Sequence, residues 1–119
     1  MNNTSELNAQ LKRNENMWQI WEQNGINSET EFIVNFHFYT PKKENMELLC
    51  QKLGNQNTPT SVKETRTLIF LKGWKIEAEI LKKWTLDELQ LKTKRIVFIA
   101  QQAGVSLEGC SAMMPKRQG

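Results

Sequence analysis

His37 is the only histidine in the sequence and the residue best suited to proton transfer near neutral pH. Strand alternation predicts that a carboxylate, Glu77 or Glu79, lies close to it on a neighbouring strand. A histidine paired with a carboxylate can act as a general base. No nucleophile motif or glycine-rich phosphate loop accompanies these residues. We therefore interpret His37 as a surface or structural residue, and an enzyme built around it is the weakest functional hypothesis.

The two cysteines, Cys50 and Cys110, do not have the spacing of metal ligands. One histidine with scattered acidic residues does not form a metal site either. We therefore predict neither a metal nor another cofactor. Cys50 falls on the apolar side of a predicted helix, which favours a packing role, and both cysteines should be free thiols in a reducing compartment.

Acidic and basic residues are interspersed along the chain, which carries 16 Lys and Arg against 13 Asp and Glu, a net charge of +3. This mild excess permits weak attraction to nucleic acid but is typical of a solvated surface of mixed charge. Direct nucleic-acid binding is therefore disfavoured. A nucleic-acid-binding module that uses scattered basic residues is the alternative function.

No apolar run approaches the ~20 residues needed to cross a bilayer, and the first residues lack the basic and apolar parts of a secretory signal. We therefore expect a cytoplasmic protein without a membrane partner. A length of 119 residues suits one domain. Within that single domain, 1–119, we expect loose ends at 1–5 and 115–119, an N-terminal helix at 6–24 and a core at 31–113.

The strand at 31–40 is the element around which the rest is organised. Its apolar residues recur at every second position, which places them on one face. The opposite face is mixed. This pattern is typical of a central strand covered by helices on one side only. The first set is Phe32, Val34, Phe36 and Phe38, and the second is Ile33, Asn35, His37 and Tyr39.

The N-terminal helix carries Trp18 and Trp21 near one side. Docking on the protein's own core is favoured over a partner-binding arm, because an exposed tryptophan patch lowers solubility. Asn14 interrupts the apolar stripe, so we expect the first half of this helix to fray.

After the first strand, Thr40 and Pro41 should open a helix, as its N-cap and its first residue. Residues 65–81 predict a β-hairpin with Lys72 and Gly73 as the tight turn. Because Lys-Gly is a weaker turn signal than Asn-Gly, a longer bulged strand is the alternative.

The last helix should begin at a capping box formed by Thr85 and Glu88 and run to about Ala103. Its segment 97–100 is apolar nearly all round, so we expect it to be deeply enclosed. Residues 105–113 then form a final strand.

The order of helix followed by β-α-β-β-α-β predicts an α+β fold, a ferredoxin-like sandwich with a four-stranded antiparallel sheet and the N-terminal helix added. The first and third strands should be central. The uncovered side of the sheet should carry Asn35, His37, Tyr39, Lys75, Glu77 and Glu79.

Laid out in this order, the sequence resembles the regulator of ribonuclease activity B family, the ribonuclease E inhibitor B type. The resemblance covers about residues 15–112. It rests on the order and spacing of short motifs: Asn24-Gly25, the histidine-bearing strand 32–38, 52–54, the helix end 100–104, and 107–110.

The resemblance implies a non-enzymatic, cytoplasmic bacterial protein that binds the scaffold region of ribonuclease E and modulates RNA decay. The implied partner is a protein, ribonuclease E or another degradosome-type component, and the oligomeric state stays open. Strand alternation and the resemblance together give the candidate partner-binding residues Asn35, His37, Tyr39, Glu77, Glu79, Glu108, Gly109 and Cys110.

Overall fold

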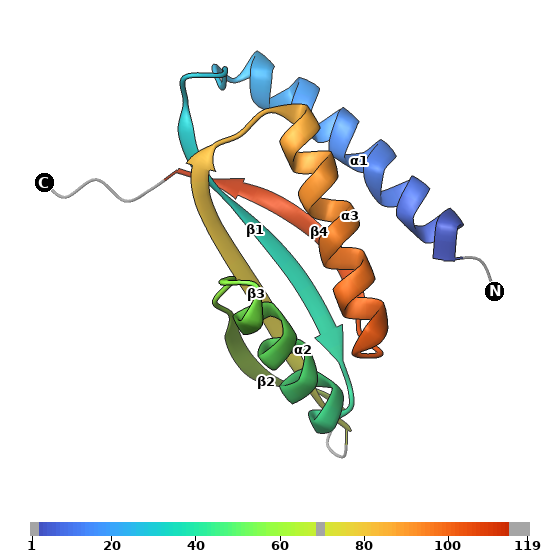
Figure 1. The fold of residues 1–119 in the computed structure, drawn as a ribbon. Helices are drawn as coiled ribbons and strands as arrows, with labels where there is room; N and C mark the ends of the chain where they lie inside the picture. The colour runs from blue at the N-terminus through green and yellow to red at the C-terminus, as the bar shows by residue number, and fades with distance from the viewer. Residues whose placement is uncertain (1–2, 69–70, 115–119) are drawn as a thin grey trace, which may run out of the picture.

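The computed structural model describes residues 3–68 and 71–114, in three helices and four strands (Figure 1). Helix α1 already begins at Asn3, where a loose start was predicted, and the predicted loose end at 115–119 lies outside the described residues. The elements are α1 Asn3–Gln23, β1 Glu31–Thr40, α2 Lys43–Asn55, β2 Ser61–Leu68, β3 Leu71–Lys83, α3 Leu86–Gln102 and β4 Ser106–Met113.

The four strands form one antiparallel sheet in the order β2-β3-β1-β4. Strands β1 and β3 are central, as predicted. Helices α2 and α3 cover one face of the sheet, and α1 lies alongside α3 above β4 (Figure 1). The predicted α+β class with a four-stranded antiparallel sheet is confirmed.

The core lies between the sheet and the helices, and the alternation of β1 builds its floor. All four apolar residues predicted to face the helices are fully buried, and Trp84 packs edge-on against Phe36 with ring centroids 6.4 Å apart. Strand β3 adds Ile76 and Ala78 on the same side. The core is completed by α2 and α3, chiefly through Leu49, Leu53, Leu89, Ile96 and Ala100.

The capping box at the start of α3 is confirmed. The Thr85 hydroxyl accepts a hydrogen bond from the Glu88 backbone N–H at 3.1 Å, and the Glu88 carboxylate accepts one from the Thr85 N–H at 3.1 Å. The carboxylate also lies 3.1 Å from the Lys82 ammonium, whose hydrogen bond holds the pKa of Glu88 below its ordinary value. The two reciprocal hydrogen bonds between Thr85 and Glu88 therefore fix where this helix begins.

Two expectations about helices are wrong. Helix α2 begins at Lys43 after an N-cap at Lys42 that has no side-chain cap; the Thr40 hydroxyl instead accepts from the Lys42 N–H at 3.2 Å, within the turn before the helix. In α3 the enclosure of 97–100 fails at Phe98, which is 61% exposed. Helix α3 packs against α1, α2 and β4, and Leu91 and Phe98, seven residues apart, are exposed on its outer side.

Docking of α1 on the core is confirmed, but the predicted fraying around Asn14 is wrong. Trp18 is buried, and both Trp18 and Trp21 pack against the ring of Phe32. Asn14 is fully buried, and its Nδ2 donates to Gln90 Oε1 at 3.0 Å and to the Thr93 hydroxyl at 2.9 Å. The interruption in the apolar stripe is therefore a polar contact with α3.

The β-hairpin is present, but the turn is not at Lys72-Gly73. Gly73 pairs with Thr65 inside the β2–β3 ladder, which continues to the pair Leu68 and Leu71. Residues 69–70 lie outside the described residues. The glycine serves another purpose, because a Cβ there would collide with the phenol ring of Tyr39. An aromatic side chain lying over a strand glycine is a known means of stabilising a sheet at such a position.

We therefore expect Gly73→Ala to have opposite effects in two backgrounds. In the natural sequence it should lower the free energy of unfolding by about 1–3 kcal/mol, because the methyl group overlaps Tyr39. In a Tyr39→Ala background it should be neutral or raise it by about 0.5–1 kcal/mol, since glycine inside a strand is less stable than alanine. Urea denaturation of the four proteins measures this coupling, and additive effects would contradict the contact.

Candidate partner-binding face

The side of the sheet opposite α2 and α3 is called the open face. Its central row comes from β1, with Asn35, His37 and Tyr39 pointing away from the helices. The register aligns β3 and β4 residues beside each of them. The flanking residues are Glu79, Glu77 and Lys75 on β3 and Ser111, Gly109 and Ser106 on β4. Strand alternation therefore predicted the β1 and β3 residues of this face correctly.

His37 is held between two side chains from the neighbouring strands. Its Nδ1 lies 3.3 Å from Glu77 Oε2, and its Nε2 lies 3.0 Å from the Ser111 hydroxyl. Lys75 Nζ lies 3.8 Å from the same Glu77 oxygen. The predicted proximity of Glu77 is found, whereas Ser111 was missed. The β1–β4 register would have indicated it, because Ser111 lies directly opposite Asn35 and therefore shares a face with His37.

Ser111, His37 and Glu77 are linked in the same order as the three residues of a catalytic Ser-His-acid triad. Acyl transfer also needs a bound substrate and donors aimed at the developing oxyanion. The shallow hollow beside His37 is lined by Lys75, Glu108, Gly109 and Cys110 among the described residues, and Ser111 does not line it. The two partners therefore fix the orientation of the imidazole on the surface.

Asn35 differs from its neighbours because it is only 4% exposed. Its Oδ1 has no hydrogen-bond partner among the described residues, and its Nδ2 has only a long contact, 3.9 Å, to the sulfur of Met113. A buried acceptor without a donor is costly in free energy. A donor supplied from above the open face would remove this cost.

An apolar row crosses one end of the open face. Leu81 and Met113 lie opposite Ile33 in the register, and they are 49% and 41% exposed. Exposed apolar side chains bordered by polar ones are typical of protein–protein contact surfaces. This row was not recognised from the sequence, because Leu81 and Met113 come from the ends of two strands whose register only the sheet reveals.

The remaining candidate residues, Glu108, Gly109 and Cys110, lie at a β-bulge in β4. The register shifts between His37 and Phe38, which leaves Glu108 as the extra residue, and Gly109 adopts φ +154°, a value that favours glycine. Glu108 is exposed and its carbonyl accepts a hydrogen bond from Arg13 at 3.2 Å. The bulge thus ties β4 to α1.

Cys110 borders the hollow beside His37, but its thiol points to the opposite side of the sheet from the other candidate side chains. It pairs with Phe36, and its thiol contacts Asn14 Oδ1 of α1 at 3.5 Å. Burial raises the pKa of this thiol to about 12, so it is protonated near neutral pH and a poor nucleophile. The open face therefore brings together Asn35, His37, Tyr39, Glu77, Glu79, Glu108 and Gly109, without the thiol of Cys110.

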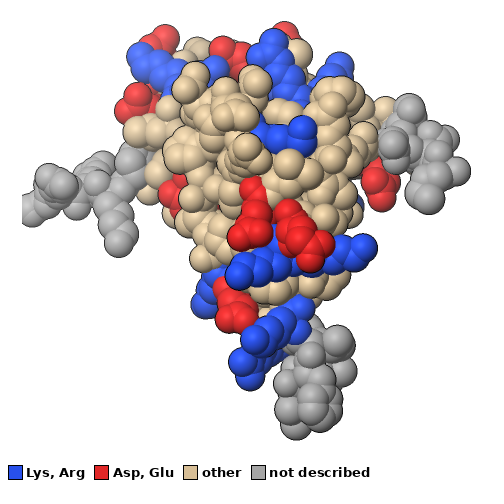
Figure 2. Space-filling model, turned by 60° about the horizontal axis from the view of Figure 1, so that its bottom comes forward, with Lys and Arg blue, Asp and Glu red and all other residues tan. Residues whose placement is uncertain are grey.

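Charged side chains of both signs are interspersed on the surface. In the view of Figure 2, lysine and arginine lie next to aspartate and glutamate rather than forming one positive area. A basic stripe is the usual footprint of nucleic-acid binding, and the surface visible in Figure 2 does not present one. In the part of the chain that the structure describes, no cluster of His, Cys, Asp and Glu could hold a metal ion, and no helix could span a membrane.

Comparison with protein families identifies a family that matches most of the chain. The family model "Regulator of ribonuclease activity B" matches residues 11–111, which include both central strands, α2, α3 and most of α1 and β4. The chain belongs to this family. The resemblance stated from the sequence motifs is confirmed. Comparison with curated proteins found no match. The family is one of regulators of ribonuclease activity, which supports a regulatory role for this chain. All candidate residues of the open face lie within the matched segment, and of the apolar row only Met113 lies beyond it.

Proposed function

We propose that this protein is a non-enzymatic, cytoplasmic regulator that binds the scaffold region of ribonuclease E through the open face and thereby changes RNA decay. Family membership supports a regulatory role, and the motif resemblance supports ribonuclease E as the partner. The observation that carries the choice of surface is Asn35, whose buried Oδ1 lacks a donor on an otherwise polar sheet face.

The composition of the open face suits a protein partner. Protein interfaces combine apolar and aromatic contact with a few well-placed polar groups. Here Tyr39 supplies an aromatic ring held against Gly73, and His37 presents an imidazole fixed on both sides. The acidic Glu77 and Glu79 would repel the phosphates of RNA, so a protein segment is favoured over nucleic acid.

The test measures affinity for the purified scaffold region of ribonuclease E by calorimetry. The double variant His37→Ala/Tyr39→Ala should bind about 10- to 100-fold more weakly, because aromatic groups at the centre of an interface contribute most of the affinity. The matched control is Leu91→Ala/Phe98→Ala, which removes two exposed side chains from the outer side of α3. This control should bind as the natural protein does.

Equal affinity of the His37/Tyr39 variant, or an equal loss in the control, would contradict the proposed surface. Capture from native lysate with the same proteins tests the partner separately. If another protein is recovered by the natural chain and lost with the His37/Tyr39 variant, the surface stands and ribonuclease E is the wrong partner.

A further inference from the structure

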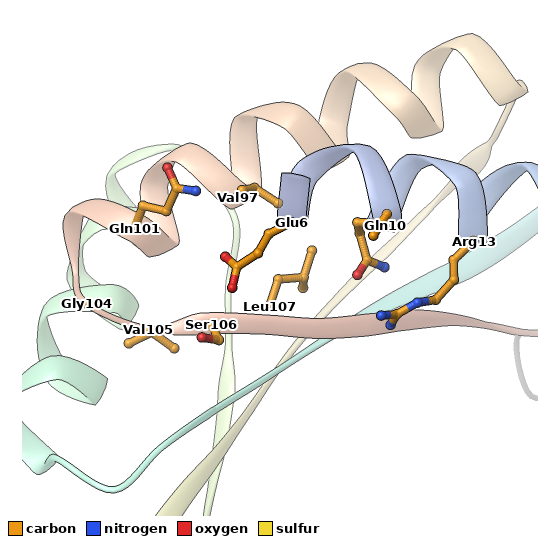
Figure 3. Close-up of a pocket in the computed structure, with 10 residues that line it drawn as sticks. Glu6, Gln10, Arg13, Val97, Gln101, Gly104, Val105, Ser106 and Leu107 are labelled. Atoms are coloured by element: carbon orange, nitrogen blue, oxygen red, sulfur yellow. The ribbon is translucent and has the colours of Figure 1, made fainter. Parts of the chain in front are cut away.

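A second concave surface lies at the free edge of β4, beneath the first half of α1. It is a groove of about 460 Å³ between α1, the end of α3 and β4, here called the α1–β4 groove (Figure 3). Its polar lining residues are Glu6, Gln10 and Arg13 from α1, Gln101 from α3 and Ser106 from β4. It is separate from the open face, because α1 lies on the helix side of the sheet.

Gln10 is the unusual residue of this groove. It is only 5% exposed, and its Nε2 has no hydrogen-bond partner among the described residues. Figure 3 shows its side chain extending from α1 toward β4. Buried amides in proteins are almost always hydrogen-bonded, so an unpaired one lining a groove indicates an acceptor that is supplied from outside.

The floor of the groove is the edge of a sheet. Among the described strands β4 pairs only with β1, so its other side is free. In an antiparallel ladder alternate residues direct both N–H and C=O outward, so one of the neighbours Ser106 and Leu107 presents both groups to the groove. Arg13 already donates to the carbonyl of Glu108, which shows that donors on α1 reach this strand.

The two ends of the groove carry opposite charges. Glu6 and Arg13 are seven residues apart on α1, about 10.5 Å along the helix, and Gln10 lies between them. An extended chain covers that length in about three residues. The groove therefore combines a free strand edge, an unpaired amide donor and two opposite charges whose separation matches about three residues of an extended chain.

We propose that the α1–β4 groove binds an extended peptide segment of another protein, which adds to β4 as a fifth strand. A carbonyl of the peptide accepts from Gln10 Nε2, an acidic side chain lies beside Arg13, and a basic side chain lies beside Glu6. Strand addition at a sheet edge is a common mode of peptide recognition. Glu6 and Gln10 precede the segment matched by the family, so the inference does not rest on family membership or on the proposed function.

The probe is a displayed library of random nine-residue linear peptides, selected on the full chain. Selection should enrich peptides rich in β-branched and aromatic residues, with one acidic and one basic residue two to four positions apart. Selection on a Glu6→Arg/Arg13→Glu variant should reverse the order of the two charges. Failure to enrich any such pattern, or the same order on both proteins, would overturn the proposal.

Gln10→Leu separates a binding role from a structural one. Leucine keeps an apolar contact and removes the unpaired donor, so the melting temperature of the free protein should rise. The enriched peptide should nevertheless bind about tenfold more weakly by fluorescence anisotropy, because its carbonyl loses the donor. A lower melting temperature or unchanged affinity would overturn the role of Gln10. The His37→Ala/Tyr39→Ala variant should bind the peptide normally; loss of binding there would place the peptide on the open face instead.

Discussion

Phe36→Ala should lower the free energy of unfolding by about 3–5 kcal/mol, the range for aromatic residues removed from a packed core. Phe36 is fully buried at the centre of β1 and contacts the ring of Trp84, which is itself buried. A small domain has a total stability of about 5–15 kcal/mol, so the variant should be close to unfolding at 37 °C. Urea denaturation followed by tryptophan fluorescence measures the loss.

The matched control is Phe98→Ala, which makes the same change on the outer side of α3. Because Phe98 is 61% exposed, its removal should change stability by less than about 0.5 kcal/mol. Similar losses at both positions would show that burial against the helices does not set the contribution of Phe36, contrary to the described core.

Asn14→Asp should cost about 3–5 kcal/mol at pH 7, because it places an unpaired carboxylate in a buried site. The Nδ2 that donates to Gln90 and Thr93 would become an oxygen. This oxygen would then face Gln90 Oε1, which is also an acceptor. Asn16→Asp makes the same change on an exposed position of the same helix and should have little effect.

The cost at position 14 should depend on pH. Burial raises the pKa of the new carboxyl in the folded state above its unfolded value of about 3.9, so the folded protein binds the extra proton. The difference in stability from the natural protein should therefore be smallest below about pH 4 and grow as the pH rises through the folded-state pKa. A pH-independent cost would show that the side chain at position 14 reaches water.

The parts of the fold that could be predicted from the sequence are those specified locally. The alternation along β1 and β3 fixed which residues face the core, because a side chain in a strand has only two directions. The capping box of Thr85 and Glu88 fixed the start of α3, since both partners lie within four residues. From these elements the central position of β1 and β3 followed.

The errors arose where partners are distant in the sequence. Asn14 was interpreted as a defect because its partners, Gln90 and Thr93, lie 76 and 79 residues away. Gly73 was interpreted as a turn residue because the ring that lies over it is that of Tyr39, which comes from another strand. A pattern within one segment does not contain this information.

The misplacement of Cys110 among the candidate residues also arose from a feature that alternation within one segment does not reveal. Strict alternation from Glu108 would place Cys110 on the face that Glu108 shares, but the bulge adds a residue and turns Cys110 toward α1. The same shift brings Ser111 beside His37. Since the sequence carries no strong signal for a bulge other than Gly109, neither placement could be predicted.

The irregular β4 edge also bears on self-association. A straight, uncovered edge strand invites pairing with identical copies of the chain, and this is a common start of aggregation. Here the extra residue interrupts the repeat of hydrogen-bonding groups, while Arg13 occupies one carbonyl and α1 overhangs the strand. The edge is therefore a poor template for edge-to-edge pairing with another sheet, yet it retains a short stretch at Ser106–Leu107 that a single extended chain can reach.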